Sequence, residues 1–504
     1  MSRLSLLWLA LCVGAFVILC VVSWDFVADD AYISARYANN LANGYGFVWN
    51  PHGALVEGFS NPLLVAAEAV GHLAGIPPIT VARGIGVGSG VALLLVIGLY
   101  APIVVGRVAS NIALLLVASY PPLAFWAVGG LETLPAALVV TGGVLLLCRE
   151  PSRRRAVSAG SVLAVLPWLR PEGIVLAVAA AAAAELPRAY VRGARREALV
   201  RLALAAGIPL ASQAVLELFR RAVYGHLLPN SALFKTGTGG TFDVLSRFGV
   251  QAAPVILAAA AGVVLARGRT RVLAVPPLVY AVGAIGALNQ VNAFSRFLLP
   301  SWPQLALLAG ISLAALGAAL GRGRVAVTVS AAAALAVAGL LLLDGNVRDT
   351  TTSAARYADC GQRARGKASK WLRRHTPPDG AYAVSDVGLI GATSGTRTVI
   401  DQLGLNEAYI QHGGPLSFAD RAKYVLDRRP DAIVLVSRHA HSFVASYSTD
   451  AVVAAEPRFT NYRLAHVARV GWTCHYQLFI YRRGAPRQIR APGGGRPAPT
   501  AAGG

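Results

Sequence analysis

The adjacent carboxylates Asp29 and Asp30 are the residues in this sequence best suited to acid–base chemistry. They directly follow an apolar run and head an amphipathic stretch, residues 31–42. Two carboxylates in a partly buried site repel each other, which raises the pKa of one of them and makes it a suitable base for a hydroxyl. The structural alternative is a helix cap, because Asp often precedes a helix.

Three further carboxylates, Glu57, Glu132 and Glu172, lie at the ends of apolar runs. A charged side chain inside a membrane costs free energy, so its presence there usually marks a functional residue. Glu57 stands in a loop that ends in Asn61-Pro62, where it either binds a ligand or caps the next helix. These residues predict a polar site on one side of a membrane.

The composition indicates a membrane protein. Of 504 residues, 55% are hydrophobic and only 14% are charged, whereas soluble domains have about a quarter charged residues. The net charge of +22 comes from short basic clusters between apolar runs. That pattern is typical of cytoplasmic loops and not of a nucleic-acid groove, so nucleic acid is excluded as a partner.

The apolar runs predict a polytopic α-helical domain over residues 1–343, with about 11 transmembrane helices of about 20 residues each. If the N-terminus is inside, every basic cluster between spans is cytoplasmic. The first outer loop, residues 25–78, includes an interfacial helix over 61–76. The expected helices are residues 4–24, 79–105, 109–128, 133–148, two short helices within 158–186, 199–219, 250–266, 272–288, 297–317 and 325–343.

After residue 343 the composition becomes that of a soluble domain. Residues 344–484 predict an extracytoplasmic α/β domain, with buried strands at 381–385, 431–436 and 476–481 and helices at 363–374 and 418–428. The tail, residues 485–504, is rich in Gly, Pro and Arg, which predicts disorder.

Cys360 and Cys474 both fall in this soluble region. In an oxidising compartment they predict a disulfide, and the alternative is two unpaired thiols. No CxxC motif is present, which disfavours a thiolate metal site. The outer carboxylates leave a divalent metal possible, although no spacing of His, Asp or Glu demands one.

Several strings in the chain resemble a known class of enzyme. They are Asp29-Asp30-Ala31-Tyr32-Ile33-Ser34-x-Arg36-Tyr37-Ala38, Val56-Glu57-Gly58-Phe59-Ser60-Asn61-Pro62, Gly130-Leu131-Glu132-Thr133, Arg170-Pro171-Glu172-Gly173, Tyr224-Gly225-His226-Leu227-Leu228-Pro229-Asn230, Lys235, Arg296-Phe297-Leu298-Leu299-Pro300, Ser385-Asp386-Val387-Gly388 and Ile400-Asp401-x-Leu403-Gly404-Leu405. Together they resemble actinobacterial GT-C glycosyltransferases, in particular the mycobacterial terminal β-(1→2)-arabinofuranosyltransferases. The first outer loop is the most specific part of the resemblance.

The resemblance implies that a carboxylate of this loop is the general base, with Asp29 preferred over Asp30. It also implies a polyprenyl-phosphate-linked sugar as donor, decaprenyl-phosphoryl-arabinose for the arabinosyl members, and a glycan as acceptor. By their place in the matching strings, Arg36, Tyr37, Asn61 and Asn230 are expected to bind substrate, together with Glu57, Glu132 and Glu172.

The phosphate that leaves such a donor carries two negative charges, so cations near the outer leaflet are expected to stabilise it. The outer candidates are Arg170, His226, Lys235 and Arg296. Each has a structural alternative: a salt bridge between Arg170 and Glu172, a hydrogen-bonded His226, a snorkelling Lys235 and an interfacial anchor at Arg296.

The sequence and the resemblance together predict arabinofuranosyl transfer to cell-envelope arabinan (arabinogalactan or lipoarabinomannan), on the outer face of the cytoplasmic membrane. An alternative is transfer of another polyprenyl-phosphate sugar, such as mannose or another hexose. A lipid-linked sugar transporter is a reading from a different class, for which interrupted helices are also typical. A binding or scaffold protein of the envelope is the third alternative.

Overall fold

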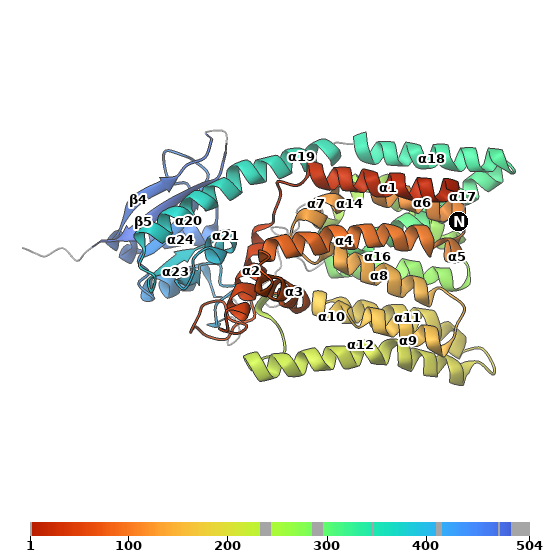
Figure 1. Cartoon of the computed structure of the whole chain (residues 1–504), viewed down its shortest axis with the longest axis horizontal. Coiled ribbons are helices and arrows are strands. Elements are labelled where there is room, and N and C mark those ends of the chain that lie inside the picture. Colours follow the sequence, from red (N-terminus) through yellow and green to blue (C-terminus); the bar gives the residue numbers. More distant parts are fainter. Residues whose placement is uncertain are drawn as a thin grey trace, which may run out of the picture.

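The computed structural model describes residues 3–231, 243–284, 296–343, 346–409, 416–471 and 474–484. Long helices lie side by side in a bundle, and a smaller domain with a five-stranded sheet lies at one end of it (Figure 1). Helix α2 lies where the bundle meets the sheet domain (Figure 1).

The helices of the bundle and of the first loop follow the apolar runs of the sequence. In chain order they are α1 (Arg3–Val22), α2 (Asp29–Ala42), α3 (Pro62–Leu73), α4 (Pro78–Leu99), α5 (Pro102–Val105), α6 (Arg107–Ala118), α7 (Pro121–Val128), α8 (Thr133–Leu147), α9 (Arg153–Leu163), α10 (Leu166–Leu169), α11 (Gly173–Ala189), α12 (Arg195–Tyr224), α14 (Asp243–Gln251), α15 (Ala253–Leu265), the 3₁₀ helix η1 (Gly268–Ala274), α16 (Val275–Ala284), the 3₁₀ helix η4 (Leu299–Ser301), α17 (Trp302–Leu320) and α18 (Arg324–Leu343).

Proline and glycine set several of the helix boundaries. Proline is the first residue of α3, α4 and α7, where its missing N–H costs no hydrogen bond. The predicted helix 109–128 is broken just before Pro121, and its halves, α6 and α7, are bent by 58°. Helix α12 ends at Gly225, whose φ of 77° is the left-handed conformation that glycine adopts readily.

Fewer helices than predicted are long and apolar enough to be identified as membrane spans among the described residues. Among the described residues, five helices are long and apolar enough to cross a membrane, and six if the bent pair α6 and α7 counts as one span. Helices α3, α8 and α15 are apolar but shorter. The chain is therefore a multi-pass membrane protein with helices at the predicted places, but the predicted count of about 11 spans is not established.

The sheet domain consists of α19 (Asn346–Arg356), the π-helical segment η5 (Tyr357–Gln362), α20 (Arg363–His375), β1 (Ala381–Val384), α21 (Val387–Ala392), β2 (Thr398–Asp401), α23 (Phe418–Asp427), β3 (Ala432–Ser437), α24 (Ser448–Ala455), the 3₁₀ helix η6 (Pro457–Asn461), β4 (Tyr462–Ala468) and β5 (Gln477–Arg483). The strand order is β2-β1-β3-β5-β4; β1 is parallel to β2 and β3, and β5 is antiparallel to β3 and β4. The predicted strands β1, β3 and β5 and helices α20 and α23 are confirmed.

The first loop and the sheet domain share one apolar core. Tyr37 and Phe59 of the loop belong to the same buried cluster as Tyr382 and Ile390 of the sheet domain. The indole of Trp49 also donates to the backbone oxygen of Val399 in β2, at 2.9 Å. The loop that carries Asp29 and Asp30 is therefore fixed against the sheet domain.

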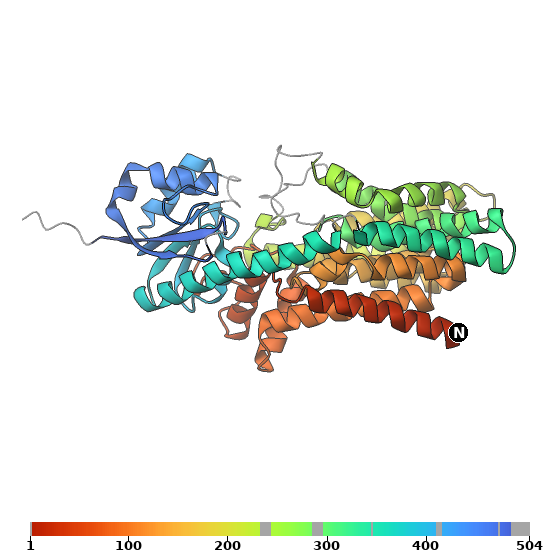
Figure 2. The same ribbon diagram turned by 90° about the horizontal axis from the view of Figure 1, so that it is seen from above.

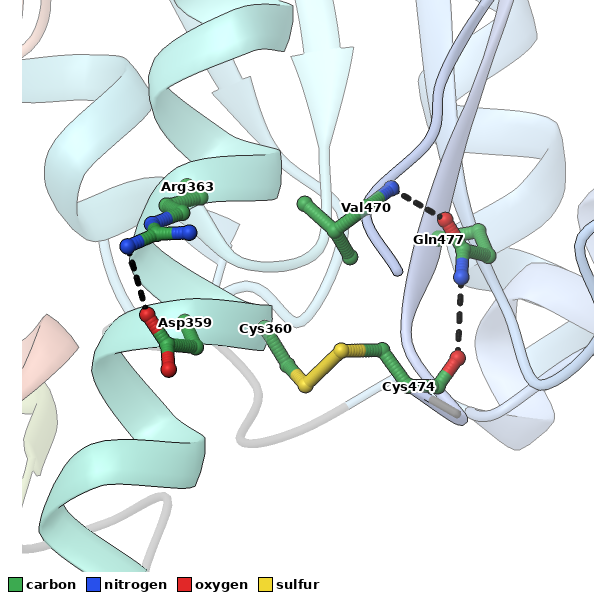
Figure 3. The surroundings of a disulfide bond; sticks show 6 residues. All are labelled: Asp359, Cys360, Arg363, Val470, Cys474 and Gln477. Carbon is green, nitrogen blue, oxygen red and sulfur yellow. Dashed lines mark hydrogen bonds and ion pairs between the residues drawn. A yellow bond between two sulfur atoms is a disulfide. The ribbon is translucent and has the colours of Figure 1, made fainter. Parts of the chain in front are cut away.

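A run of helix connects the bundle to the sheet domain. Helices α19, η5 and α20 follow one another along this connection (Figure 2). A disulfide joins Cys360 of η5 to Cys474, which precedes β5, as expected from the sequence (Figure 3). Beside it, the Gln477 side chain accepts from the Val470 amide and donates to the Cys474 carbonyl oxygen. These contacts tie the connecting helix to the sheet.

Candidate functional site

A small hollow lies where the bundle, the first loop and the sheet domain meet. Its walls come from the start of α2, the loop before α3, the turn before α8, and segments far along the chain. The lining residues are Asp30, Ile33, Ser34, Gly58, Phe59, Ser60, Asn61, Leu131, Glu132, Ser231, Arg296 and Leu405. The structure thus brings together four of the predicted site residues: Asp30, Asn61, Glu132 and Arg296.

Asp30 is the most accessible carboxylate of this hollow. Its side chain is 36% exposed, and its Oδ2 lies 3.5 Å from Nη1 of Arg296. Within the described residues, Arg296 is the one side chain that forms an ion pair with Asp30. The carboxylate therefore keeps oxygen lone pairs available to a molecule that enters the hollow.

Glu132 is the buried anchor of the same site. Its Oε1 accepts from Nη2 of Arg296 at 3.0 Å, and its Oε2 accepts from Nδ2 of Asn61 at 3.0 Å. The Asn61 oxygen in turn accepts from the hydroxyl of Ser34, at 3.0 Å. Glu132 therefore orients both a cation and an amide toward the space in front of Asp30.

Two buried arginines supply positive charge near Glu132. Arg170 lies 3.8 Å from Glu132 and also pairs with Glu172, so its structural alternative, a salt bridge, is present. In the described part of the chain, Nε of Arg296 and Nη1 of Arg170 are buried without a hydrogen-bond partner. A buried N–H without a partner costs free energy, and an anionic ligand is one way to satisfy it.

Asp29, the base preferred from the sequence, faces away from the hollow. Its carboxylate accepts from the backbone amides of Gly388 at 2.9 Å and Leu389 at 3.0 Å, in the first turn of α21. A Cβ at position 388 would lie 2.0 Å from the Asp29 carbonyl oxygen, so the two helices approach closely. The helix-cap alternative applies to Asp29, but on α21 and not on its own helix.

Asp29 belongs to a closed cluster around Arg365. Nε of Arg365 lies 3.4 Å from Asp29, and its Nη2 donates to Asp386 at 2.8 Å. Tyr447 and Tyr476 donate to Asp386 as well. Burial raises the pKa of Asp29. Burial also raises the pKa of Asp386, but the Arg365 guanidinium and the tyrosine hydroxyls outweigh it and hold that pKa below its usual value.

Arg36 and Tyr37, expected to bind substrate, instead tie α2 to its surroundings. The Arg36 guanidinium donates to backbone oxygens of Trp49 and Arg397, at 2.6 and 3.1 Å, and lies over the Trp49 ring. The Tyr37 hydroxyl donates to the Val56 oxygen at 2.8 Å. Both side chains are buried and lie outside the hollow, because tertiary contacts use their polar atoms.

Glu57 neither lines the hollow nor caps α3. It forms a buried pair with Arg220 of α12, at 2.9 Å. Burial raises the pKa of Glu57 to about 7, although Arg220 opposes this shift. The pair fastens the first loop to the bundle.

The remaining predicted residues also lie elsewhere. The Asn230 amide donates to the backbone oxygens of Leu405 and Glu407, at 3.1 and 3.0 Å. Half-buried His226 and Glu172 are not among the residues that line the hollow. Lys235 lies outside the described residues.

Several lining residues were not selected from the sequence. Ser34 and Ser60 stand inside the matching strings, but nothing in their type separates them from structural serines. Ser231 lies just after a matching string and Leu405 ends another, but only the tertiary structure brings them to the hollow. Leu405 matters because it shows that the sheet domain forms part of the wall.

Whether the site binds a divalent metal stays open, as it was from the sequence. Over the ranges that the structure describes, no group of three or more His, Cys, Asp and Glu side chains is placed to hold a metal ion.

Comparisons with known proteins bear on the fold. A family model described as a domain of unknown function (DUF8728) matches residues 353–481, inside the sheet domain. No curated protein sequence matches the chain. Among solved structures, ArnT from Cupriavidus metallidurans bound to undecaprenyl phosphate aligns with a TM-score of 0.63 and 14% identity, over 95% of this chain and 98% of that one.

A second solved structure also aligns with almost the whole chain. The oligosaccharyltransferase AglB from Archaeoglobus fulgidus, in complex with an inhibitory peptide and a dolichol-phosphate, aligns with a TM-score of 0.58 and 14% identity, over 97% of this chain and 75% of that one. The chain has the GT-C fold. In a GT-C protein of this kind, the hollow of Asp30 lies between the membrane bundle and the terminal sheet domain.

Proposed function

We propose that this GT-C protein is a membrane glycosyltransferase that uses a polyprenyl-phosphate-linked sugar as donor and Asp30 as general base. The observation that carries the proposal is the partly exposed Asp30 carboxylate, which lines a hollow at the edge of the bundle and pairs there with Arg296. The likeness to ArnT and AglB supports the donor class, because those structures contain undecaprenyl phosphate and a dolichol-phosphate.

The proposed reaction is one displacement at the anomeric carbon. Asp30 takes the proton of the acceptor hydroxyl, whose oxygen forms a bond to that carbon. The bond from the carbon to the carrier phosphate oxygen breaks, and its electron pair leaves with the phosphate. Arg296, held by Glu132, stabilises the charge that develops there, since donors oriented in advance need no reorganisation during the reaction.

The finer proposal is transfer of arabinofuranose from decaprenyl-phosphoryl-arabinose to cell-envelope arabinan, on the outer face of the cytoplasmic membrane. The resemblance of the first outer loop to arabinosyltransferases supports the sugar. The disulfide in the sheet domain supports an oxidising, extracytoplasmic compartment for the site.

A donor panel tests both levels of the proposal. The purified full-length protein is incubated in lipid nanodiscs with radiolabelled polyprenyl-phosphate arabinose, mannose and glucose, each with an arabinan oligosaccharide and a mannan oligosaccharide. Transfer from the arabinose donor alone supports the finer proposal. Transfer from a hexose donor alone supports the class and overturns the sugar, and no transfer from any donor contradicts the transferase proposal.

A further inference from the structure

A second charged hollow lies at the opposite end of α8 from Asp30. Helix α8 begins directly after Glu132, at the first hollow, and ends at Leu147, which lines the second. Helix α11 also connects the two ends of the bundle: it begins after the turn that contains Arg170, and its residue Glu185 lines the second hollow. The second hollow is small, and its charged lining residues are Arg149, Glu150, Arg155, Glu185 and Arg269.

Arg269 is the fixed cation of this hollow. Its Nε donates to the Leu147 oxygen at 2.6 Å, and its Nη2 pairs with Glu185 at 2.7 Å. The side chain is only 11% exposed, and Nη1 is buried without a hydrogen-bond partner within the described residues. A donor is therefore held ready in a place where water is largely excluded.

The two carboxylates that line the hollow, Glu150 and Glu185, do not neutralise the arginines around it. Glu185 is shared, because Arg201 also pairs with it at 2.9 Å. Two guanidinium groups thus meet one carboxylate, and a positive charge is left over.

Two further arginines, Arg149 and Arg155, outnumber the second carboxylate, Glu150, so positive charge remains in excess. Arg149 lies over the Tyr100 ring, with its Cζ 5.6 Å from the ring centroid, and forms no ion pair in the part of the chain that the structure describes. Arg155 donates to the Glu150 backbone oxygen at 2.6 Å, which leaves the rest of its guanidinium available. Three arginines therefore surround one small hollow at the end of the bundle.

We infer that this hollow is a phosphate-binding site for the phosphodiester headgroup of an anionic phospholipid or for free phosphate. Guanidinium groups match phosphate oxygens with paired hydrogen bonds, and basic hollows between membrane helices bind anionic headgroups. A bound phosphate would also satisfy Nη1 of Arg269. This inference is independent of the proposed function, because it concerns the other end of the bundle.

The experiment measures the apparent melting temperature of the purified, delipidated full-length protein in detergent. Phosphatidylglycerol is titrated against phosphatidylcholine in one arm, and inorganic phosphate against chloride at equal ionic strength in the other. Arg149→Gln is the test variant, because it removes a cation without breaking an ion pair. Arg192→Gln is the matched control, since Arg192 is exposed, follows α11 at the same end and is not in the hollow.

We expect the wild type to be stabilised by phosphatidylglycerol and not by phosphatidylcholine. Arg149→Gln should need about tenfold more lipid for the same stabilisation, as expected for the loss of a hydrogen bond to a charged group. Arg192→Gln should behave as the wild type. If inorganic phosphate alone gives the same pattern of stabilisation, the site binds free phosphate and the inference also stands.

The inference is overturned if neither ligand stabilises the wild type, or if Arg149→Gln and Arg192→Gln respond alike. Should Arg149→Gln not fold, Arg155→Gln replaces it with the same expectations. Native mass spectrometry then counts the phosphatidylglycerol retained, and equal retention by Arg155→Gln and the wild type also overturns the inference.

Discussion

Asp29 and Asp30 are neighbours in the chain, but they serve two regions of the molecule that differ in kind. The Asp29 carboxylate, 15% exposed, is enclosed by two backbone amides and Arg365. The Asp30 carboxylate, 36% exposed, meets the hollow and one arginine. Successive residues of a helix do not face the same side, so adjacent carboxylates readily point into different surroundings.

The difference shows how two residues of one type take different roles. A carboxylate whose two oxygens each accept from a protein donor, beside a buried guanidinium, holds helices together and is enclosed by protein groups. A carboxylate with one partner and open space can accept a proton from a bound hydroxyl. The closed cluster of Asp29, Arg365 and Asp386 thereby fixes the start of α2, and the start of α2 places Asp30.

The most direct test of the separate roles of Asp29 and Asp30 is to remove the charge of each residue in turn. Asp30→Asn should lower the turnover by about 10²- to 10⁴-fold, the usual contribution of a general base, while the melting temperature stays the same. Turnover is measured with whichever donor is active in the panel. Asp29→Asn is the matched variant and should lower the melting temperature. Loss of activity in Asp29→Asn without loss of stability, together with an active Asp30→Asn, would reverse the two roles.

The closed cluster should fail when its cation is removed. Arg365→Met leaves Asp29 and Asp386 buried without a compensating charge, and it should cost about 3–5 kcal/mol of unfolding free energy. Denaturant unfolding of the full chain measures this.

A control for that variant lies two residues earlier. Arg363 pairs with Asp359 on the surface, with side chains 70% and 57% exposed. Arg363→Met should change the stability by less than about 1 kcal/mol. Equal losses in the two variants would show that the buried cluster is not special.

The disulfide stabilises the same region mainly because it restricts the conformations of the unfolded chain. The cross-link joins residues 114 positions apart, so the double variant Cys360→Ser/Cys474→Ser should lose about 2–5 kcal/mol. Thermal unfolding with and without a reductant measures the effect. The wild type should respond to the reductant and the double variant should not; a double variant as stable as the wild type would contradict the prediction.

The smallest effect concerns Asp450, a buried carboxylate that has hydrogen bonds but forms no ion pair with any residue the structure describes. It accepts from the Val436 amide at 2.7 Å and from the Ser385 hydroxyl. Burial raises its pKa to about 7 from the usual 3.8, in contrast to the lowered pKa of Asp386 beside Arg365. Its stabilising contribution is therefore present below about pH 4 and is lost as the pH rises through 7.

The Asp450→Asn variant isolates this contribution. The melting temperature of the variant, relative to the wild type, should increase between pH 4 and pH 7, because asparagine carries no charge to bury. A difference that is constant over that range would show that Asp450 is already ionised at the lower pH.

Much of the fold was predictable because apolar runs, prolines and arginine clusters carry local signals. The strands β1, β3 and β5 are apolar and buried, so they stand out in the sequence. Strand β2 ends in the charged residue Asp401, and the edge strand β4 contains Arg463 and His466 and exposes residues 463–465, so neither reads as a buried apolar run. The number of spans was harder, since short apolar helices look like spans by composition alone.

The site was predictable in its residue types and less so in its contacts. Glu132, Asn61 and Arg296 were selected from three separate strings, and the structure brings them together. Arg36 and Tyr37 have partners in the sheet domain, more than 350 positions away, as well as in the first loop, and their role in substrate binding stays a prediction. No local pattern separates an arginine that binds a ligand from one that binds its own backbone.

Gly388 has a consequence for reading related chains. Its α-carbon lies so close to the first turn of α2 that no side chain fits between them. The absence of a side chain at one position thus records a contact with a residue 359 places earlier. In a homologue of this protein, a larger residue there would signal that the first loop has moved outward, and that the carboxylate next to Asp29 has moved with it.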